Sequence, residues 1–136
     1  MLGSQSVASA YKKDGRKIVA MLQNDMTGYV SPKDRSKPVM GVVGDFVDPT
    51  LTEFIKKLIT KYADLDFVDT RCGYGCSDHA SWNKAGYRSA FPFEGKFGDI
   101  SPYVHSTRDT IDTVDFDHMK EFGKLALSFA VELSHI

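Results

Sequence analysis

The sequence predicts a single α/β domain built around a largely parallel sheet. Helical and extended patterns alternate along the chain, and this order is typical of α/β layers. Residues 17–25 contain a continuous apolar run and residues 39–46 contain a second. Such runs are typical of strands buried on both faces of a parallel sheet. The length of 136 residues fits one domain, and a hydrophobic content of 42% is ample for its core.

The first part of the chain is expected to form one helix and two strands. The helix spans residues 4–13 and is ended by Gly15, since glycine commonly follows the last helical turn. The first strand spans residues 17–25, where the apolar run becomes polar before Asp25. The second strand spans residues 39–46.

The middle of the chain carries a clear helix signal. Asp48 is placed to cap the helix and Pro49 to begin it, because these residue types prefer these positions. The apolar residues that follow recur with helical spacing and predict one buried stripe: Leu51, Phe54, Ile55, Leu58, Ile59 and Tyr62. A short third strand is expected at residues 66–70.

The last part of the chain is expected to hold a short helix at residues 79–85, ended by Gly86, and an extended segment at residues 87–93. Residues 94–112 are rich in Gly, Pro, Ser and Asp and predict a loop. A long amphipathic helix at residues 115–133 follows, with this apolar stripe: Phe116, Met119, Phe122, Ala126, Phe129 and Leu133.

Charge and apolar patterning argue against two classes of partner. The net charge is −1, and no Lys/Arg cluster is long enough to follow a phosphate backbone, so nucleic acid is not an expected partner. The longest uninterrupted apolar run, residues 18–22, is too short to span a membrane. The first residues lack the basic and apolar regions of a secretory signal, so we expect no signal peptide in this chain.

Residues 72–82 gather both cysteines and the only tryptophan. Cys72 and Cys76 lie four positions apart with no third thiol, which indicates one small disulfide rather than a thiolate metal site. The intervening Gly73 and Gly75 allow a tight turn. A disulfide indicates an oxidising compartment, which conflicts with the missing signal.

Four polar side chains each have two interpretations. Asp25 either starts an Asx turn at a strand end or is a carboxylate ligand held on a rigid strand. His105 is either a solvated loop histidine or an imidazole oriented for metal ligation. Asp78 and His79 are either a ligand pair or the start of a helix. We favour Asp78 as a helix cap.

These candidates are expected to gather at one edge of the sheet. Asp25 follows the first strand, Cys72 the third and residues 91–93 end the fourth, and ligands bind beyond the carboxyl ends of strands in open α/β sheets. Four aromatic residues are either core or the wall of an apolar pocket: Tyr74, Phe91, Phe93 and Phe97. These patterns favour a hydrolase or metal site and do not name the reaction.

Five motifs give the chain a resemblance to a known family. They cover residues 21–29, 72–82, 85–87, 92–94 and 105–110. In this order they resemble the secreted co-catalytic dizinc aminopeptidases, of the bacterial and fungal leucyl aminopeptidase type. The resemblance implies a phosphorylase/hydrolase-like three-layer α/β sandwich with a mixed, mostly parallel sheet. It also implies two zinc ions that share a bridging water, and a peptide substrate with an apolar N-terminal residue such as leucine.

The same resemblance implies roles for the candidate residues. Asp25 would be a terminal ligand of one zinc and His105 a terminal ligand of the other. Ser77 would hydrogen-bond a ligand carboxylate, and Tyr74 would lie close to the bound substrate. The substrate pocket would be shaped by the small disulfide and by apolar side chains: Met26, Cys72, Cys76, Phe91, Phe93, Phe97 and Val104.

The family's zinc sites need further residues. In the family, a histidine, a bridging aspartate and the second Glu of a Glu-Glu pair complete the sites, and the first Glu of that pair is the general base. All four lie before the part matched here, and residues 1–4 resemble the end of the segment that follows the pair. We therefore expect residues 1–136 to be a single partial domain, the C-terminal portion of such an enzyme with its N-terminal half missing, as in a truncated gene model.

This chain alone is expected to bind zinc weakly and to lack peptidase activity, with no catalytic residue of its own. Two alternatives are a non-catalytic peptide-binding module and one half of a split enzyme. Missing strands would leave an open sheet edge beside residues 18–22, through which the chain could self-associate. The parent enzyme is expected to be extracellular or in the secretory or vacuolar system, its signal lost with the N-terminal half.

Overall fold

The computed structural model describes residues 1–135. The elements follow one another in this order: α1 (Leu2–Lys13), β1 (Met21–Leu22), β2 (Val39–Val43), α2 (Pro49–Tyr62), β3 (Asp66–Thr70), α3 (His79–Lys84), β4 (Ser89–Phe93), the short 3-10 helices η1 (Phe97–Asp99) and η2 (Ile111–Thr113), and α4 (Phe116–Ser134). Every helix and strand expected from the sequence is present; β3 has the predicted bounds, and those of the other elements are shifted. Among the described residues, no helix combines the length and the apolar character that a membrane crossing requires.

The four strands form one mixed sheet in the order β1-β4-β2-β3. β1 runs parallel to β4, and β2 runs parallel to β3. β2 and β4 are antiparallel, with Val43 opposite Phe91. Two of the three pairings are therefore parallel, which confirms the mixed, mostly parallel sheet.

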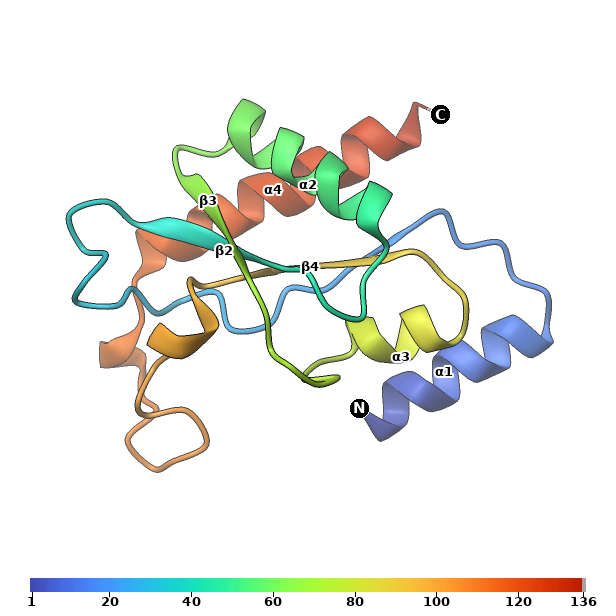
Figure 1. Cartoon of the computed structure of the whole chain (residues 1–136), viewed down its shortest axis with the longest axis horizontal. Coiled ribbons are helices and arrows are strands. Elements are labelled where there is room, and N and C mark those ends of the chain that lie inside the picture. The colour runs from blue at the N-terminus through green and yellow to red at the C-terminus, as the bar shows by residue number, and fades with distance from the viewer. Residues whose placement is uncertain (136) are drawn as a thin grey trace.

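Helices cover both faces of this sheet and make three layers. Figure 1 shows α2 and α4 together on one face and α3 and α1 on the other. Beneath α2 and α4 lies the larger core cluster, in which Met40 and Val42 of β2 and Ala90 of β4 pack against the two helices. On the opposite face, Val43 and Phe91 belong to a second cluster. Alternate residues of a strand point to opposite faces, so β2 and β4 each contribute to both clusters.

The helix α2 forms as its sequence predicts. The Asp48 carboxylate accepts a hydrogen bond from the Leu51 amide at 2.7 Å, and Pro49 occupies the first turn. Such a cap pairs one of the N–H groups that a helix start leaves without a partner. Within the stripe, Leu51, Ile55 and Ile59 are almost completely buried. The predicted buried stripe is confirmed except at Tyr62, which is 38% exposed.

Two predicted apolar surfaces differ from the structure. The strand expected at residues 17–25 is reduced to the two residues of β1, and Val19 is 58% exposed. β1 lies at the sheet edge, and both of its residues are only partly buried, so the expectation of a strand buried on both faces was wrong. In α4 the buried face centres on Phe122 and Leu125, whereas Phe116 and Met119 are exposed.

Candidate functional site

One cavity of about 390 Å³ gathers nearly all of the site residues expected from the sequence. Cys72 does not line it but packs against its floor. The cavity lies over β4 and is enclosed by the loops that follow β1, β3 and β4. Its lining includes two residues that the sequence did not single out, Ile100 and Asp109. The predicted residues in the lining are Asp25, Met26, Tyr74, Cys76, Phe91, Phe93, Phe97, Val104 and His105.

These residues meet over one face of the sheet, not at a common edge of carboxyl ends. β2 and β3 run opposite to β4, so the carboxyl ends of the strands point in two directions. The sequence-based expectation of a single edge was therefore wrong. The loop after β3 reaches the site because the disulfide turn packs on β4, where Cys72 and Cys76 contact the cluster of Phe91 and Phe93.

Aromatic rings form the floor of the cavity. Phe91 and Phe93 are 1% and 2% exposed, and their ring centroids lie 5.5 Å apart in an edge-to-face arrangement. Phe97 continues the row, 5.5 Å from Phe93. Tyr74 contacts Phe97 edge-on at 6.3 Å and is 59% exposed. The result is an apolar floor with a tyrosine at its rim, suited to an apolar side chain.

The turn that carries Tyr74 is fixed at both ends. Cys72 and Cys76 form a disulfide, as the sequence predicted. The Asp45 carboxylate accepts hydrogen bonds from the amides of Cys72 at 3.2 Å and Gly73 at 2.6 Å. Gly73 has a φ of +83°, which glycine adopts without strain. The segment that follows β2 thus holds the turn against the cavity.

The two expected metal ligands lie at the open side of this cavity. Asp25 and His105 are both exposed, and the Ser77 hydroxyl donates a hydrogen bond to one Asp25 oxygen at 2.7 Å. Met26 and His105 have left-handed backbone, with φ of +56° and +60°. This conformation is uncommon for residues other than glycine and is enriched at functional sites.

The donor types fit zinc, but their number does not complete a zinc site. Zinc takes carboxylate oxygen and imidazole nitrogen, and a catalytic zinc usually has three protein ligands. Asp25 and His105 line the same cavity. Within residues 1–135, no group of three or more His, Cys, Asp or Glu side chains is arranged to hold a metal ion. The described part of the chain therefore carries donors of the right kind without a full ligand set.

Asp78 and His79 do not form a ligand pair. His79 is fully buried, and its ring stacks on Phe91 with centroids 4.6 Å apart. Burial holds the pKa of this imidazole below its ordinary value. Asp78 occupies the N-cap position of α3, as expected, but its side chain makes no capping hydrogen bond. His79 is thus a core residue beneath the cavity floor.

One buried acid near the site was missed from the sequence. Glu94 follows β4 directly and is 6% exposed. Desolvation raises the pKa of its carboxyl, opposed by hydrogen bonds from backbone amides that include that of Tyr29. The available signal was its position, an acid at the end of a fully buried strand, where a charge needs dedicated partners.

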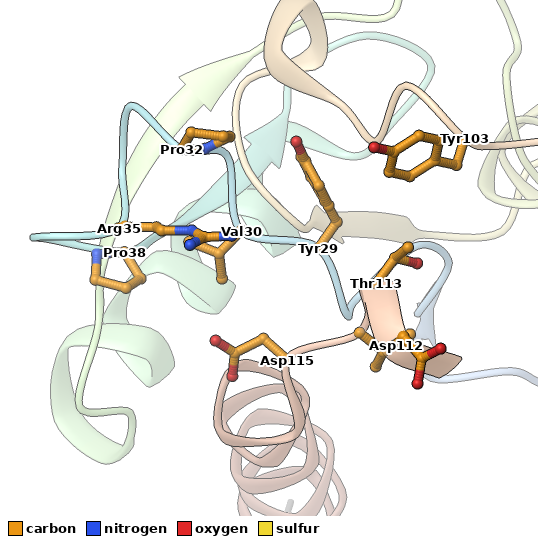
Figure 2. A pocket seen from close by; sticks show the side chains of 10 residues that line it. Tyr29, Val30, Pro32, Arg35, Pro38, Tyr103, Asp112, Thr113 and Asp115 are labelled. Carbon is orange, nitrogen blue, oxygen red and sulfur yellow. The ribbon is translucent and has the colours of Figure 1, made fainter. Parts of the chain in front are cut away.

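A larger cavity lies elsewhere in the molecule. It measures about 690 Å³ and lies between the loop after β1 and the start of α4. Figure 2 shows Tyr29 and Arg35 from that loop and Asp115 at the start of α4 among its lining side chains. None of the site residues expected from the sequence lines it. The combination of aromatic floor and metal-type donors, not size, singles out the smaller cavity.

Comparison with known proteins gives a consistent assignment. The family model described as Peptidase family M28 matches residues 1–130. A leucine aminopeptidase 1 of the fungus Phaeosphaeria nodorum is 52% identical over an alignment of 136 positions, which covers 98% of this chain and 35% of that protein. The chain thus spans about a third of the length of the curated relatives it matches.

Solved structures agree with this match. The LapA aminopeptidase of Legionella pneumophila superposes with a TM-score of 0.91 at 43% identity, covering 96% of this chain and 35% of that one. A zinc aminopeptidase of Bacillus subtilis shares the fold, with a TM-score of 0.65 at 20% identity over 93% of this chain and 32% of its own. By sequence and by structure, the chain belongs to peptidase family M28.

Proposed function

We propose that this chain provides the substrate pocket and two metal ligands of a zinc-dependent aminopeptidase that removes apolar N-terminal residues such as leucine. One observation carries the proposal. A single cavity combines an aromatic floor of Phe91, Phe93 and Phe97 with Asp25 and His105 at its open side. Membership of peptidase family M28 and the similarity to a leucine aminopeptidase support the same activity.

In this proposal, the pocket selects the substrate by apolar burial. A leucine side chain that leaves water gains about 1.5–3 kcal/mol, whereas a charged side chain has no partner on the aromatic floor. Met26 and Val104 provide the side walls, and Tyr74 is at the rim, where the substrate enters. The Cys72–Cys76 disulfide keeps this rim in place.

Asp25 would be a terminal ligand of one zinc ion and His105 a terminal ligand of the other. Bound zinc supplies the polarisation of the scissile carbonyl and the activation of water. Ser77 orients the Asp25 carboxylate through its 2.7 Å hydrogen bond, as partners of metal ligands commonly do. The general base and three further ligands would come from polypeptide that corresponds to the rest of the relatives' length.

It follows that residues 1–136 act as one partial catalytic domain. The isolated chain is then a weak zinc binder without peptidase activity. Its open β1 edge, with Val19 58% exposed, makes self-association the expected behaviour of the isolated chain. The disulfide fits an extracellular or secretory compartment for the parent enzyme.

A non-catalytic peptide-binding module is the second candidate. The favouring observation is that the described residues enclose the whole apolar floor and wall of the pocket, while they hold no complete metal site. In that case the pocket binds an apolar N-terminal residue and no reaction follows.

The test compares the chain alone with the chain plus a polypeptide carrying the remaining segments of a relative. Zinc uptake is measured by calorimetry and hydrolysis with leucine p-nitroanilide. We expect hydrolysis only in the mixture, lost on Asp25→Ala or His105→Ala and kept in the control Asp78→Ala. Binding of two zinc ions by the chain alone, or full activity of Asp25→Ala, would contradict the proposal. Leucine binding with no hydrolysis in any mixture favours the peptide-binding module.

A further inference from the structure

We propose that Glu94 is a positioning residue that ties together the two loops on which the expected metal ligands lie. The proposal rests on the proposed function only in naming Asp25 and His105 as those ligands. One buried carboxylate, that of Glu94, sets the separation of the two loops. Glu94 itself does not line the substrate cavity.

The two carboxylate oxygens of Glu94 are divided between the loops. Oε2 accepts a hydrogen bond from the Tyr29 amide at 3.0 Å, and Oε1 accepts one from the Ser101 amide at 3.4 Å. Tyr29 follows Asp25 by four residues, and Ser101 precedes His105 by four. The Glu94 side chain thus bridges both loops, and on each loop its contact lies four residues from the expected metal ligand.

Glu94 is itself anchored on a third element. The buried His118 of α4 has its Nε2 2.9 Å from the Glu94 carbonyl oxygen. A carbonyl oxygen can only accept, so Nε2 donates. Glu94 also continues directly from Phe93, the last residue of β4. The bridge therefore connects the loops to the central sheet and to α4.

The surroundings show how a displacement would reach the site. Glu94 lines a small cavity of about 160 Å³ together with Met26, Val104 and Asp109. The same three residues also line the substrate cavity. Met26 is next to Asp25, and Val104 is next to His105. A change in length or hydrogen bonding at Glu94 therefore acts first on the neighbours of the two ligands.

The bridge requires a carboxylate. Burying an acid at 6% exposure is costly unless its oxygens are hydrogen-bonded, and hydrogen bonds to an ionised group are about twice as strong as neutral ones. Both Glu94 oxygens accept. A glutamine side chain has only one oxygen that can accept. Its NH₂ group would face the second backbone N–H, and two donors repel each other. Glutamine can therefore hold one loop but not both.

A second buried acid offers a matched control. Glu121 is 5% exposed, accepts a hydrogen bond from the Asp64 amide at 2.7 Å and lies on α4, in the layer that it shares with α2. Its other partner is Lys124 at 2.9 Å, so it contacts neither site loop through these two interactions. Glu121→Gln therefore removes a buried carboxylate of similar burial without touching the bridge.

The experiment uses the metal-free chain and compares Glu94→Gln with Glu121→Gln by amide NMR spectra and hydrogen exchange. For Glu94→Gln we expect the amides of Tyr29 or Ser101 to exchange about tenfold faster, the effect of losing a hydrogen bond to a charged group, and the signals of Asp25, Met26, Val104 and His105 to shift. For Glu121→Gln these signals stay in place. Equal disturbance of the site loops by both variants, or no disturbance by Glu94→Gln, overturns the proposal.

A second variant covers a failure of Glu94→Gln to fold. Glu94→Asp keeps the charge but is shorter by one methylene, so we expect it to retain one loop and to loosen the other. Loss of the whole fold in both Glu94 variants assigns this residue a general structural role and overturns the proposal. Because no zinc or substrate is present, the result is independent of the test of the proposed function.

Discussion

On one face of the sheet, α2 and α4 bury a mainly aliphatic core, whereas on the other face aromatic rings, loops and a disulfide enclose the candidate site. On the helical face, buried side chains recur at each turn of α2. The site face contains residues with left-handed backbone, Met26 and His105, and is held by long-range hydrogen bonds such as that from the Tyr29 amide to Glu94. The helical face thus holds the larger core cluster, and the other face holds the candidate site.

The largest effect should come from the helical face. Ile55 is fully buried between α2 and the sheet, so Ile55→Ala should lower the free energy of unfolding by about 2–5 kcal/mol. Urea unfolding measures this change. The exposed Lys57 on the same helix is the control, and Lys57→Ala should stay within about 0.5 kcal/mol. A loss below about 1 kcal/mol for Ile55→Ala would contradict the contrast between the two faces, because the main core would then not lie beneath α2 and α4.

A smaller effect is expected from opening the disulfide on the site face. Replacing Cys72 and Cys76 by serine removes a cross-link over a very short loop, which the chain-entropy model values at about 2 kcal/mol. The spectra should change around Tyr74 and Phe97 and stay the same along α2 and α4. Changes that spread evenly over both faces would show that the two faces are not separable.

The smallest effect should be a gradual dependence of stability on pH. Burial lowers the pKa of His79 and His118 below the ordinary 6.5, so the unfolded chain takes up protons that the folded chain does not. Their contribution is present above pH 6.5 and is lost as the pH falls, by at most about 1.4 kcal/mol per pH unit for each histidine. Glu94 opposes them, because its raised pKa favours the folded state at low pH.

His79→Phe separates these contributions. It keeps an aromatic ring against Phe91 and removes one titrating group, so the fall in unfolding free energy between about pH 7 and pH 5 should become shallower. Thermal melts across this range provide the measurement. An unchanged slope would mean that His79 is not held neutral on the site face.

The helical face could be predicted from local rules, as α2 shows. Its cap at Asp48, its Pro49 and its apolar spacing are all short-range features. β1 was predicted too long because its apolar run is buried only in part, as an edge strand with a neighbour on one side. The position of β4 between β1 and β2 depends on pairing between distant segments, which no local pattern encodes.

The candidate site divides in the same way. Asp25, His105 and the pocket aromatics were identified through motif resemblance, and the structure brings them to one cavity, while their roles stay predictions. The ambiguity of Asp78 and His79 was resolved by the complete burial of His79. Glu94 was missed because its partners, Tyr29 and Ser101, are known only once the two loops are placed.

The place of β4 has a consequence for how the chain acquires its structure. β4 is the last strand along the chain, yet it lies between β1 and β2 in the sheet. On the ribosome, β1 therefore has no strand of this sheet beside it until residue 93 has been made. Pairing between such distant segments slows folding, so β1 waits without its neighbour during synthesis, and unpaired strand edges favour aggregation at that stage.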